Sequence, residues 1–238
     1  DEAIQSLKDC KSYRTGLYAI MRSLTTGAFV YYGELQTDVF HAVLANGNPL
    51  GNNLNSGSLQ PELEEFETIW GGNYTTIGST NFLISKIIPL LEDPAISASD
   101  KQEMRRYMGA AMFMRAFCYF DVAEKFCAAY DKDVAPQAFS GLPLVTDYDP
   151  TDDNSQYPER NTLSETYELI LADLEQALEL ITAHESPGTT PASMSAYVPS
   201  DVVKAMPARV ALAIKDYSLA PNMAEAVIDT RRLTLAGI

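Results

Sequence analysis

The amino-acid sequence predicts an all-α fold, a tetratricopeptide-like bundle of helix pairs with long irregular loops. Apolar residues recur at intervals of three and four along most of the chain, which is the spacing of a helix with one buried face. Explicit helix start signals precede two of these segments, and stretches rich in Gly, Pro, Asn and Ser separate the segments from one another. The 34-residue period of tetratricopeptide repeats is not visible, so the prediction rests on helix pairs joined by short turns.

The first predicted helix ends near Thr25-Thr26-Gly27. Its apolar side is formed by Leu7, Cys10, Leu17, Ile20, Met21 and Leu24. Residues 43–60 combine many Asn with Gly and Pro, a composition typical of a loop. A second helix is predicted to begin at Pro61, because the fixed φ of proline suits a first helical turn. Pro89 is expected to end or kink this second helix, since proline removes a backbone donor.

Two later helices carry capping boxes, in which the side chains at the N-cap and three residues further on satisfy each other's backbone donors. These boxes are Ser99-Asp-Lys-Gln102 and Thr162-Leu-Ser-Glu165. The helix from Ser99 is apolar nearly all round between Met108 and Val122, so we expect it at the centre of the bundle. Its aromatic residues are predicted to be buried: Phe113, Phe117, Tyr119 and Phe120.

The last third of the chain repeats the helical pattern. Ser200 is a candidate N-cap for a helix that reaches Ile214, and a short partner helix is predicted over Met223–Thr230. Pro207 falls inside the first of these helices, where a proline costs about 3 kcal/mol. The helix is therefore expected either to kink at Pro207 or to begin there.

Composition excludes several classes of protein. The 238 residues are 46% hydrophobic, which is enough for a packed core, and we treat residues 1–238 as a single helical domain. The formal net charge is -15 and Lys and Arg do not cluster, so no nucleic-acid partner is expected. The longest apolar run, Phe82–Leu91, is too short and too often interrupted to span a bilayer, which requires about 20 apolar residues.

No catalytic or metal-binding motif stands out in the sequence. Its two histidines occur in unrelated contexts, and neither a zinc-binding helix nor a serine-hydrolase turn is present. No nucleotide-binding loop occurs either, so no cofactor and no metal are predicted. Asp147–Asn154 invites comparison with a calcium loop, but it lacks Gly at the sixth position and has Pro158 in place of the bidentate Glu. The three cysteines are interpreted as small core residues: Cys10, Cys118 and Cys127.

A long motif in the middle of the chain is its most informative feature. Gly109–Phe126, followed by Gly141-Leu-Pro-Leu-Val-Thr146, resembles the signature of the SusD/RagB family of outer-membrane nutrient-binding lipoproteins. Tyr32–Asp38, the helical segment that starts at Trp70 and the segment Arg160–Leu180 are similar to other family segments. Because their order along the chain also agrees, this resemblance is more specific than any single match.

The resemblance implies non-catalytic capture of an oligosaccharide, or of a peptide, and its delivery to a SusC-like TonB-dependent transporter. It also implies a surface-exposed lipoprotein of the outer membrane, attached only through a lipid anchor that is absent from this chain. Family members are longer and add an irregular C-terminal subdomain, so we expect the chain to be a fragment, the N-terminal helical portion. A helical-repeat adaptor for other proteins is the alternative, and a glycosidase, which needs only two carboxylates, is a remote one.

Most residues of the motif are predicted to be structural. Arg115 lies in an otherwise apolar helix and must find a carboxylate or backbone carbonyls, because a buried unpaired charge is very costly. Asp173 and Arg209 are the candidate members of its network. Tyr119 and Phe120 are predicted core aromatics.

The predicted ligand contacts lie around the only tryptophan. Sugars are held by aromatic rings against their C–H faces and by amides and carboxylates on their hydroxyls. Trp70 precedes Gly71-Gly72, where missing side chains let a ligand approach the backbone, and Asn73 and Tyr74 supply an amide and a second ring. Asp38 follows the first helix and adds a carboxylate. The competing interpretation is that Trp70 and Tyr74 merely begin the apolar stripe of their helix.

Overall fold

The chain folds into a bundle of long helices, of which the computed structural model describes residues 4–35, 37, 60, 62–184 and 197–231. The helices are α1 (Leu7–Leu24), α2 (Ala28–Glu34), α4 (Glu64–Glu92), α5 (Ala98–Phe126), α6 (Leu163–Thr182), α7 (Ser200–Ala213) and α8 (Leu219–Arg231), with a short 3-10 turn η2 (Asn154–Gln156). No strand occurs in these ranges, and the all-α prediction is confirmed.

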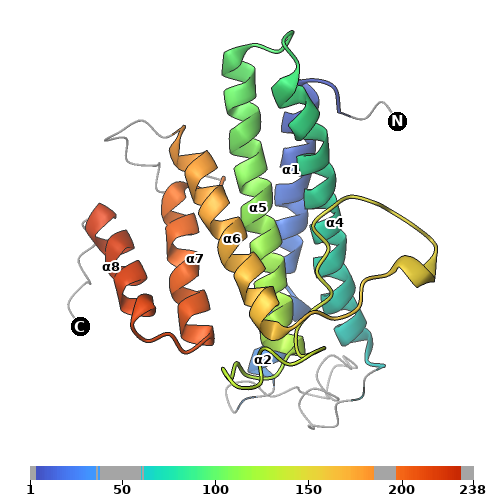
Figure 1. The fold of residues 1–238 in the computed structure, drawn as a ribbon, viewed down its shortest axis with the longest axis vertical. Helices are drawn as coiled ribbons and strands as arrows, with labels where there is room; N and C mark the ends of the chain where they lie inside the picture. Colours follow the sequence, from blue (N-terminus) through green and yellow to red (C-terminus); the bar gives the residue numbers. More distant parts are fainter. Residues whose placement is uncertain (1–3, 36, 38–59, 61, 185–196, 232–238) are drawn as a thin grey trace, which may run out of the picture.

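Helix α5 lies at the centre of the bundle (Figure 1). It packs most extensively against α6 on one side and α4 on the other, and α1 covers the groove between α4 and α5. The α7–α8 pair extends the row beyond α6 (Figure 1). Neighbouring helices therefore form the successive layers expected of helix pairs.

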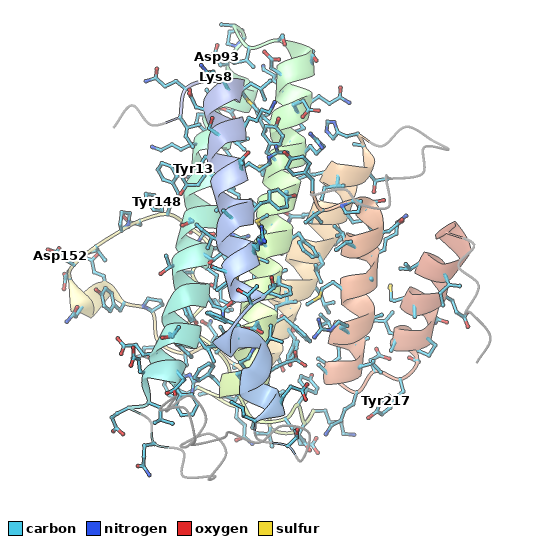
Figure 2. The ribbon with its side chains drawn as sticks, turned by 180° about the vertical axis from the view of Figure 1, so that it is seen from behind. Lys8, Tyr13, Asp93, Tyr148, Asp152 and Tyr217 are labelled. Atoms are coloured by element: carbon cyan, nitrogen blue, oxygen red, sulfur yellow. The ribbon has the colours of Figure 1, made fainter. Side chains whose placement is uncertain are left out.

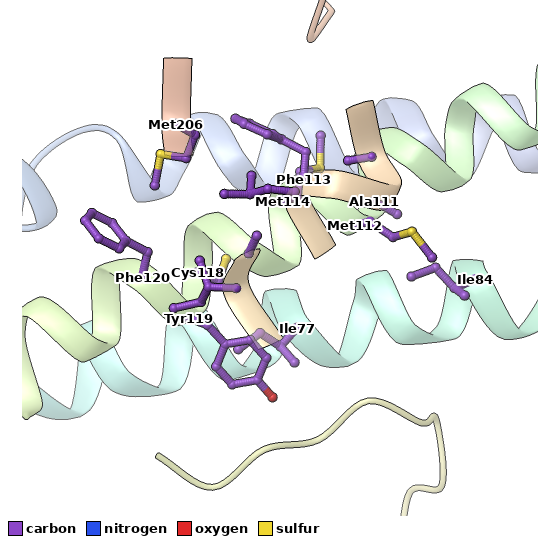
Figure 3. Packing of buried hydrophobic residues seen from close by; sticks show 14 of the residues in the cluster. Ile77, Ile84, Ala111, Met112, Phe113, Met114, Cys118, Tyr119, Phe120 and Met206 are labelled. Atoms are coloured by element: carbon purple, nitrogen blue, oxygen red, sulfur yellow. The ribbon is translucent and has the colours of Figure 1, made fainter. Parts of the chain in front are cut away.

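The core is built around the apolar surface of α5 (Figure 3). Phe113, Tyr119 and Phe120 are buried, as predicted, and they pack with residues from α4, α6 and α7. Phe117 is only partly buried, contrary to prediction. The reason is its position: Phe117 shares a helical face with Asp121 and Glu124, and this face turns toward solvent.

Four helix starts differ from those predicted, those of α4, α5, α7 and α8. The cap of α5 is Ser97, whose hydroxyl accepts from the Asp100 backbone N–H at 3.1 Å, two residues before the predicted Ser99. Helix α4 begins at Glu64, after Leu63, and helix α7 follows Pro199, so Ser200 is its first residue and not its cap. The capping box of Thr162 and Glu165 is present as predicted.

Both helical prolines are accommodated without a break. Pro89 lies in the last turn of α4, which continues to Glu92, and Pro207 lies within α7, which runs on to Ala213. Each proline removes a single hydrogen bond of its helix, and the surrounding packing keeps the helix continuous. Helix α8 begins at Leu219, earlier than the predicted Met223.

Candidate functional site

The segment after α5 is held against the start of α6 at Gly141. A Cβ atom at this position would lie 2.2 Å from the Thr162 carbonyl oxygen and 2.4 Å from the Thr166 hydroxyl. The backbone N–H of Gly141 donates to the Asn161 carbonyl at 2.9 Å, and that of Leu142 donates to the Thr166 hydroxyl at 3.1 Å. The glycine of the motif is therefore required by a close approach that any side chain would block.

Arg115 joins three parts of the molecule inside the bundle. Its Nε and Nη2 donate to Asp173 Oδ2 and Oδ1 at 2.7 and 2.6 Å, and both side chains are buried. Its Nη1 donates to Asn81 Oδ1 at 2.8 Å and to the Thr146 carbonyl at 3.0 Å. Asp173 is thus the carboxylate that Arg115 was expected to need. The predicted involvement of Arg209 is wrong, because Arg209 lies on the surface with its Nη2 3.6 Å from Glu124.

Further core side chains bind the same segment by its backbone. The Tyr119 hydroxyl donates to the Val145 carbonyl at 3.0 Å and accepts from the Val145 N–H at 2.7 Å. Tyr74 donates its hydroxyl to the Pro143 carbonyl at 2.9 Å, and Asn81 donates its amide to the Val145 carbonyl at 2.9 Å. Figure 3 shows the Tyr119 hydroxyl directed at the passing segment. We call Tyr74, Asn81, Arg115 and Tyr119 the loop clamp.

Burial affects the ionisation of the two phenols of the loop clamp. It raises the pKa of Tyr119 to about 12, and it raises the pKa of Tyr74 even further. Both hydroxyls therefore stay protonated at neutral pH and keep their donor hydrogens for the loop backbone.

Beyond the loop clamp, the chain projects from the bundle beside α4 and returns to α6 (Figure 1). This projecting loop, residues 147–158, forms one wall of an open cleft of about 490 Å³, here called the loop cleft. Its lining residues include the aromatic Tyr157, the acidic Asp147 and Asp149, and Gln156. The Tyr157 side chain is 56% exposed. The loop cleft thus combines an accessible aromatic ring with hydrogen-bonding groups, which is the composition of a small-molecule site.

An aromatic cluster lies beside the neck of this loop. The Trp70 ring stacks on Tyr74, with centroids 4.9 Å apart and planes at 28°, and meets the edge of Phe126 at 5.2 Å. The Arg160 guanidinium lies 5.9 Å from the Trp70 centroid. Because Arg160 pairs with Pro143 in an isolated antiparallel bridge, the cluster adjoins the two ends of the loop. Trp70 itself is partly buried against the core.

The structure brings together only two of the four predicted ligand contacts. Trp70 and Tyr74 are stacked, but Asn73 is fully buried and donates its amide to the Ile69 carbonyl at 2.9 Å and to Asp121 at 3.0 Å. The prediction that Asn73 contacts a ligand is therefore corrected: it is a core residue of α4. Asp38 lies outside the described residues.

Sequence reasoning missed the residues of the loop cleft. Asp149 falls in the segment compared with a calcium loop, and no sequence motif singles out Gln156 or Tyr157. An available signal was the length of the polar segment 147–158 together with Tyr148 and Tyr157, because tyrosines in a polar loop provide accessible rings.

The described residues contain no group of three or more His, Cys, Asp or Glu that could hold a metal ion. None of the helices in those same ranges is long and apolar enough to cross a membrane.

A match to a family model decides the classification of the chain. Residues 7–200 match the SusD-like model that is described as starch-binding and associating with the outer membrane. The chain belongs to the SusD-like family. The motif around Arg115 and Gly141 lies within the matched residues, and the structure shows what those two residues do in this chain: they hold the segment at the base of the loop cleft.

Individual proteins resemble this chain in sequence or in fold. A SusD-like protein of Formosa agariphila is 28% identical over 168 residues, which is 71% of this chain and 28% of the relative. A Bacteroides vulgatus structure described as sugar-binding has a TM-score of 0.76 at 24% identity and is matched over 96% of this chain and 47% of its own. A laminarin-binding SusD-like protein has a TM-score of 0.70 at 16% identity, with 94% of this chain and 44% of that protein covered. The chain thus spans less than half of each of these SusD-like relatives.

Proposed function

We propose that this SusD-like chain belongs to a non-catalytic cell-surface protein that binds an oligosaccharide and delivers it to a SusC-like TonB-dependent transporter. The observation that carries the proposal is the loop cleft, which adjoins the Trp70–Tyr74 stack. The family description as starch-binding and the laminarin-binding relative support a glycan as the ligand class. Attachment by a lipid anchor at the outer-membrane surface is part of this proposal. So is the assignment of residues 1–238 to one helical domain, the N-terminal portion of a longer protein.

In the proposed complex, the Tyr157 ring lies against the C–H face of a sugar. The carboxylates of Asp147 and Asp149 accept hydrogen bonds from its hydroxyls. Trp70 extends the aromatic surface toward the neck of the loop, so that a chain of several sugar rings is bound along the cleft.

Isothermal titration calorimetry with maltoheptaose, laminarihexaose and cellohexaose tests this proposal. Tyr157→Ala and Trp70→Ala should each weaken the binding of the preferred oligosaccharide by at least about tenfold, since stacked aromatic residues dominate such sites. Addition of that sugar should also shift the fluorescence of Trp70, the only tryptophan.

Tyr148→Ala is the matched control. Tyr148 belongs to the same loop and is 43% exposed, but its ring packs against Phe82 at 4.9 Å and does not line the cleft. Its removal should leave the affinity unchanged. Unaltered affinity in both the Tyr157 and the Trp70 variants, with circular dichroism showing a folded bundle, would refute the site. Binding of a transporter extract without any glycan binding would favour the adaptor instead.

A further inference from the structure

A second pocket lies at the other side of the molecule, where the end of α5, the first half of α6 and the α7–α8 turn meet. It has a volume of about 350 Å³, and we call it the α7–α8 pocket. Figure 2 shows Tyr217 of this turn on the side of the molecule opposite to Tyr148 and Asp152 of the projecting loop. Its volume is at the small end of the range of ligand pockets, so it fits a short ligand.

Three tyrosines line the α7–α8 pocket: Tyr130, Tyr167 and Tyr217. The Tyr130 and Tyr167 rings meet edge to face at 5.5 Å, whereas the Tyr217 side chain is 68% exposed. None of the three hydroxyls forms a hydrogen bond within the part of the chain that the structure describes. Burial raises the pKa of Tyr167 to about 12, so its hydroxyl is available as both donor and acceptor at neutral pH.

The charged groups at this pocket have opposite signs. Glu124 and Lys215 both line it, and Arg209 lies 3.6 Å from the Glu124 carboxylate. A charged ligand of either sign would be attracted by one of these groups and repelled by another, so the pocket selects neither an anion nor a cation. A neutral ligand with both donor and acceptor groups can use groups of both signs.

The backbone of Lys215 supplies an independent observation. Its φ is 60°, in the left-handed region that favours glycine. The conformation closes a Schellman-type end of α7, in which the Asp216 N–H donates to the Ala211 carbonyl at 2.8 Å and the Lys215 N–H donates to the Leu212 carbonyl at 3.1 Å. Glycine would satisfy this geometry with less strain. Lys215 thus lines the pocket at a cost in backbone energy, and such strain often accompanies a functional site.

We propose that the α7–α8 pocket binds a neutral saccharide of one or two rings, as a second sugar site separate from the loop cleft. The exposed Tyr217 ring covers the C–H face of the sugar. Glu124 accepts from the sugar hydroxyls, Lys215 donates to them, and the Tyr130 and Tyr167 hydroxyls do both. The α7–α8 pocket and the loop cleft share no lining residue, so a sugar can bind at either site without the other.

Saturation-transfer NMR and calorimetry with maltose, laminaribiose and cellobiose test this site in the full chain. The experiments use a Trp70→Ala/Tyr157→Ala background, which removes the aromatic contacts proposed for the loop cleft. At least one disaccharide should still bind. Addition of Tyr217→Ala should then weaken its binding by about tenfold.

Lys215→Gly separates a role in binding from a role in folding. Because glycine relieves the left-handed strain, the melting temperature should stay the same or rise, while the disaccharide affinity falls by at least about threefold with the loss of a charged donor. Lys215→Asn, which also tolerates this conformation, should behave in the same way. Glycylglycine, a zwitterion with no sugar ring, should not compete.

Three results would overturn the proposal. One is that no disaccharide binds in the double-variant background. Another is binding that is unchanged by both Tyr217→Ala and Lys215→Gly. The third is displacement of the disaccharide by glycylglycine. A different result would refute the loop cleft as the first sugar site. In that case the Tyr157→Ala and Trp70→Ala single variants would bind long oligosaccharides as tightly as the parent chain.

Discussion

Arg115 of α5 and Asp173 of α6 meet inside the bundle through two parallel hydrogen bonds of 2.7 and 2.6 Å. The guanidinium has a further donor that reaches the Thr146 carbonyl of the projecting loop. A single buried cation thus connects the two most closely packed helices to the base of the loop cleft. The paired carboxylate and the carbonyl groups offset the cost of placing this charge in the core.

Arg115→Ala is expected to lower the free energy of unfolding by about 3–5 kcal/mol, because it leaves the Asp173 carboxylate buried without its partner. Urea denaturation followed by circular dichroism measures the loss. Arg106→Ala is the control, since Arg106 forms only a partly exposed i,i+3 pair with Glu103, which should contribute about 0.2–1 kcal/mol. Equal effects of the two substitutions would contradict the role assigned to Arg115.

Gly141→Ala is expected to destabilise the fold by about 1–3 kcal/mol or more, because its methyl group would overlap the Thr162 carbonyl and the start of α6 would have to move. Gly78→Ala is the matched comparison. Gly78 lies within α4 with nothing within 4 Å of an added Cβ, so alanine should stabilise the helix there by about 0.5–1 kcal/mol. Thermal melts of the two variants should therefore shift in opposite directions, and a shift in the same direction would show that the close approach at Gly141 is absent.

Tyr119→Phe is expected to cost about 1–3 kcal/mol at neutral pH, since the Val145 N–H loses its acceptor and the Val145 carbonyl loses a donor. The substitution should also change how the free energy of unfolding depends on pH in the alkaline range. The pKa of Tyr119 is raised from 10.0 to about 12 in the fold, so between these values the native state keeps a proton that the unfolded state has lost. The contribution of Tyr119 is complete below pH 10 and declines as the pH rises toward 12.

Urea denaturation at a series of pH values from 8 to 11.5 checks this behaviour. The phenylalanine variant should lose less stability over the alkaline part of the series than the parent chain. Identical slopes would show that Tyr119 ionises as freely in the fold as in the unfolded chain.

Ser97→Ala is expected to destabilise the protein by about 1 kcal/mol, because it removes the acceptor for the Asp100 N–H at the start of α5. Ser99→Ala should change the stability by less than about 0.5 kcal/mol, since Ser99 is an exposed residue of the first turn. Chemical denaturation of the pair distinguishes the two candidate caps. A larger loss of stability in Ser99→Ala than in Ser97→Ala would show that α5 starts where the sequence motif predicted.

The helices were predictable because their signals are local. The apolar spacing of α1 and α6 and the capping box at Thr162 depend on residues within one or two turns, and the structure has them where they were expected. The start of α5 was misplaced because Ser97 and Ser99 both have an acceptor side chain and a polar residue three positions later. Which of the two serines caps α5 depends on the backbone path of the preceding turn, which a local sequence motif does not specify. Helix α7 does not begin at Pro207, one of the two predicted alternatives, because packing outweighs the propensity of one residue.

The binding site was less predictable because it depends on contacts far apart in the sequence. A pattern search found Trp70 and Tyr74, which are close in one helix, but placed Asn73 with them although it faces the core. The loop cleft arises only once Arg115, Asn81 and Tyr119 hold the loop backbone, from 26 to 66 positions away along the chain. The local signal in 147–158, a long polar segment with tyrosines at 148 and 157, does not by itself specify a cleft.

The loop clamp also has an evolutionary consequence. Its side chains contact the carbonyls of Pro143, Val145 and Thr146 and the N–H of Val145, all of them main-chain groups that every replacement but proline would retain. Mutations in the projecting loop can therefore change the side chains that line the loop cleft while the anchoring bonds persist. The lining of the cleft is thus free to vary at little cost to the stability of the bundle.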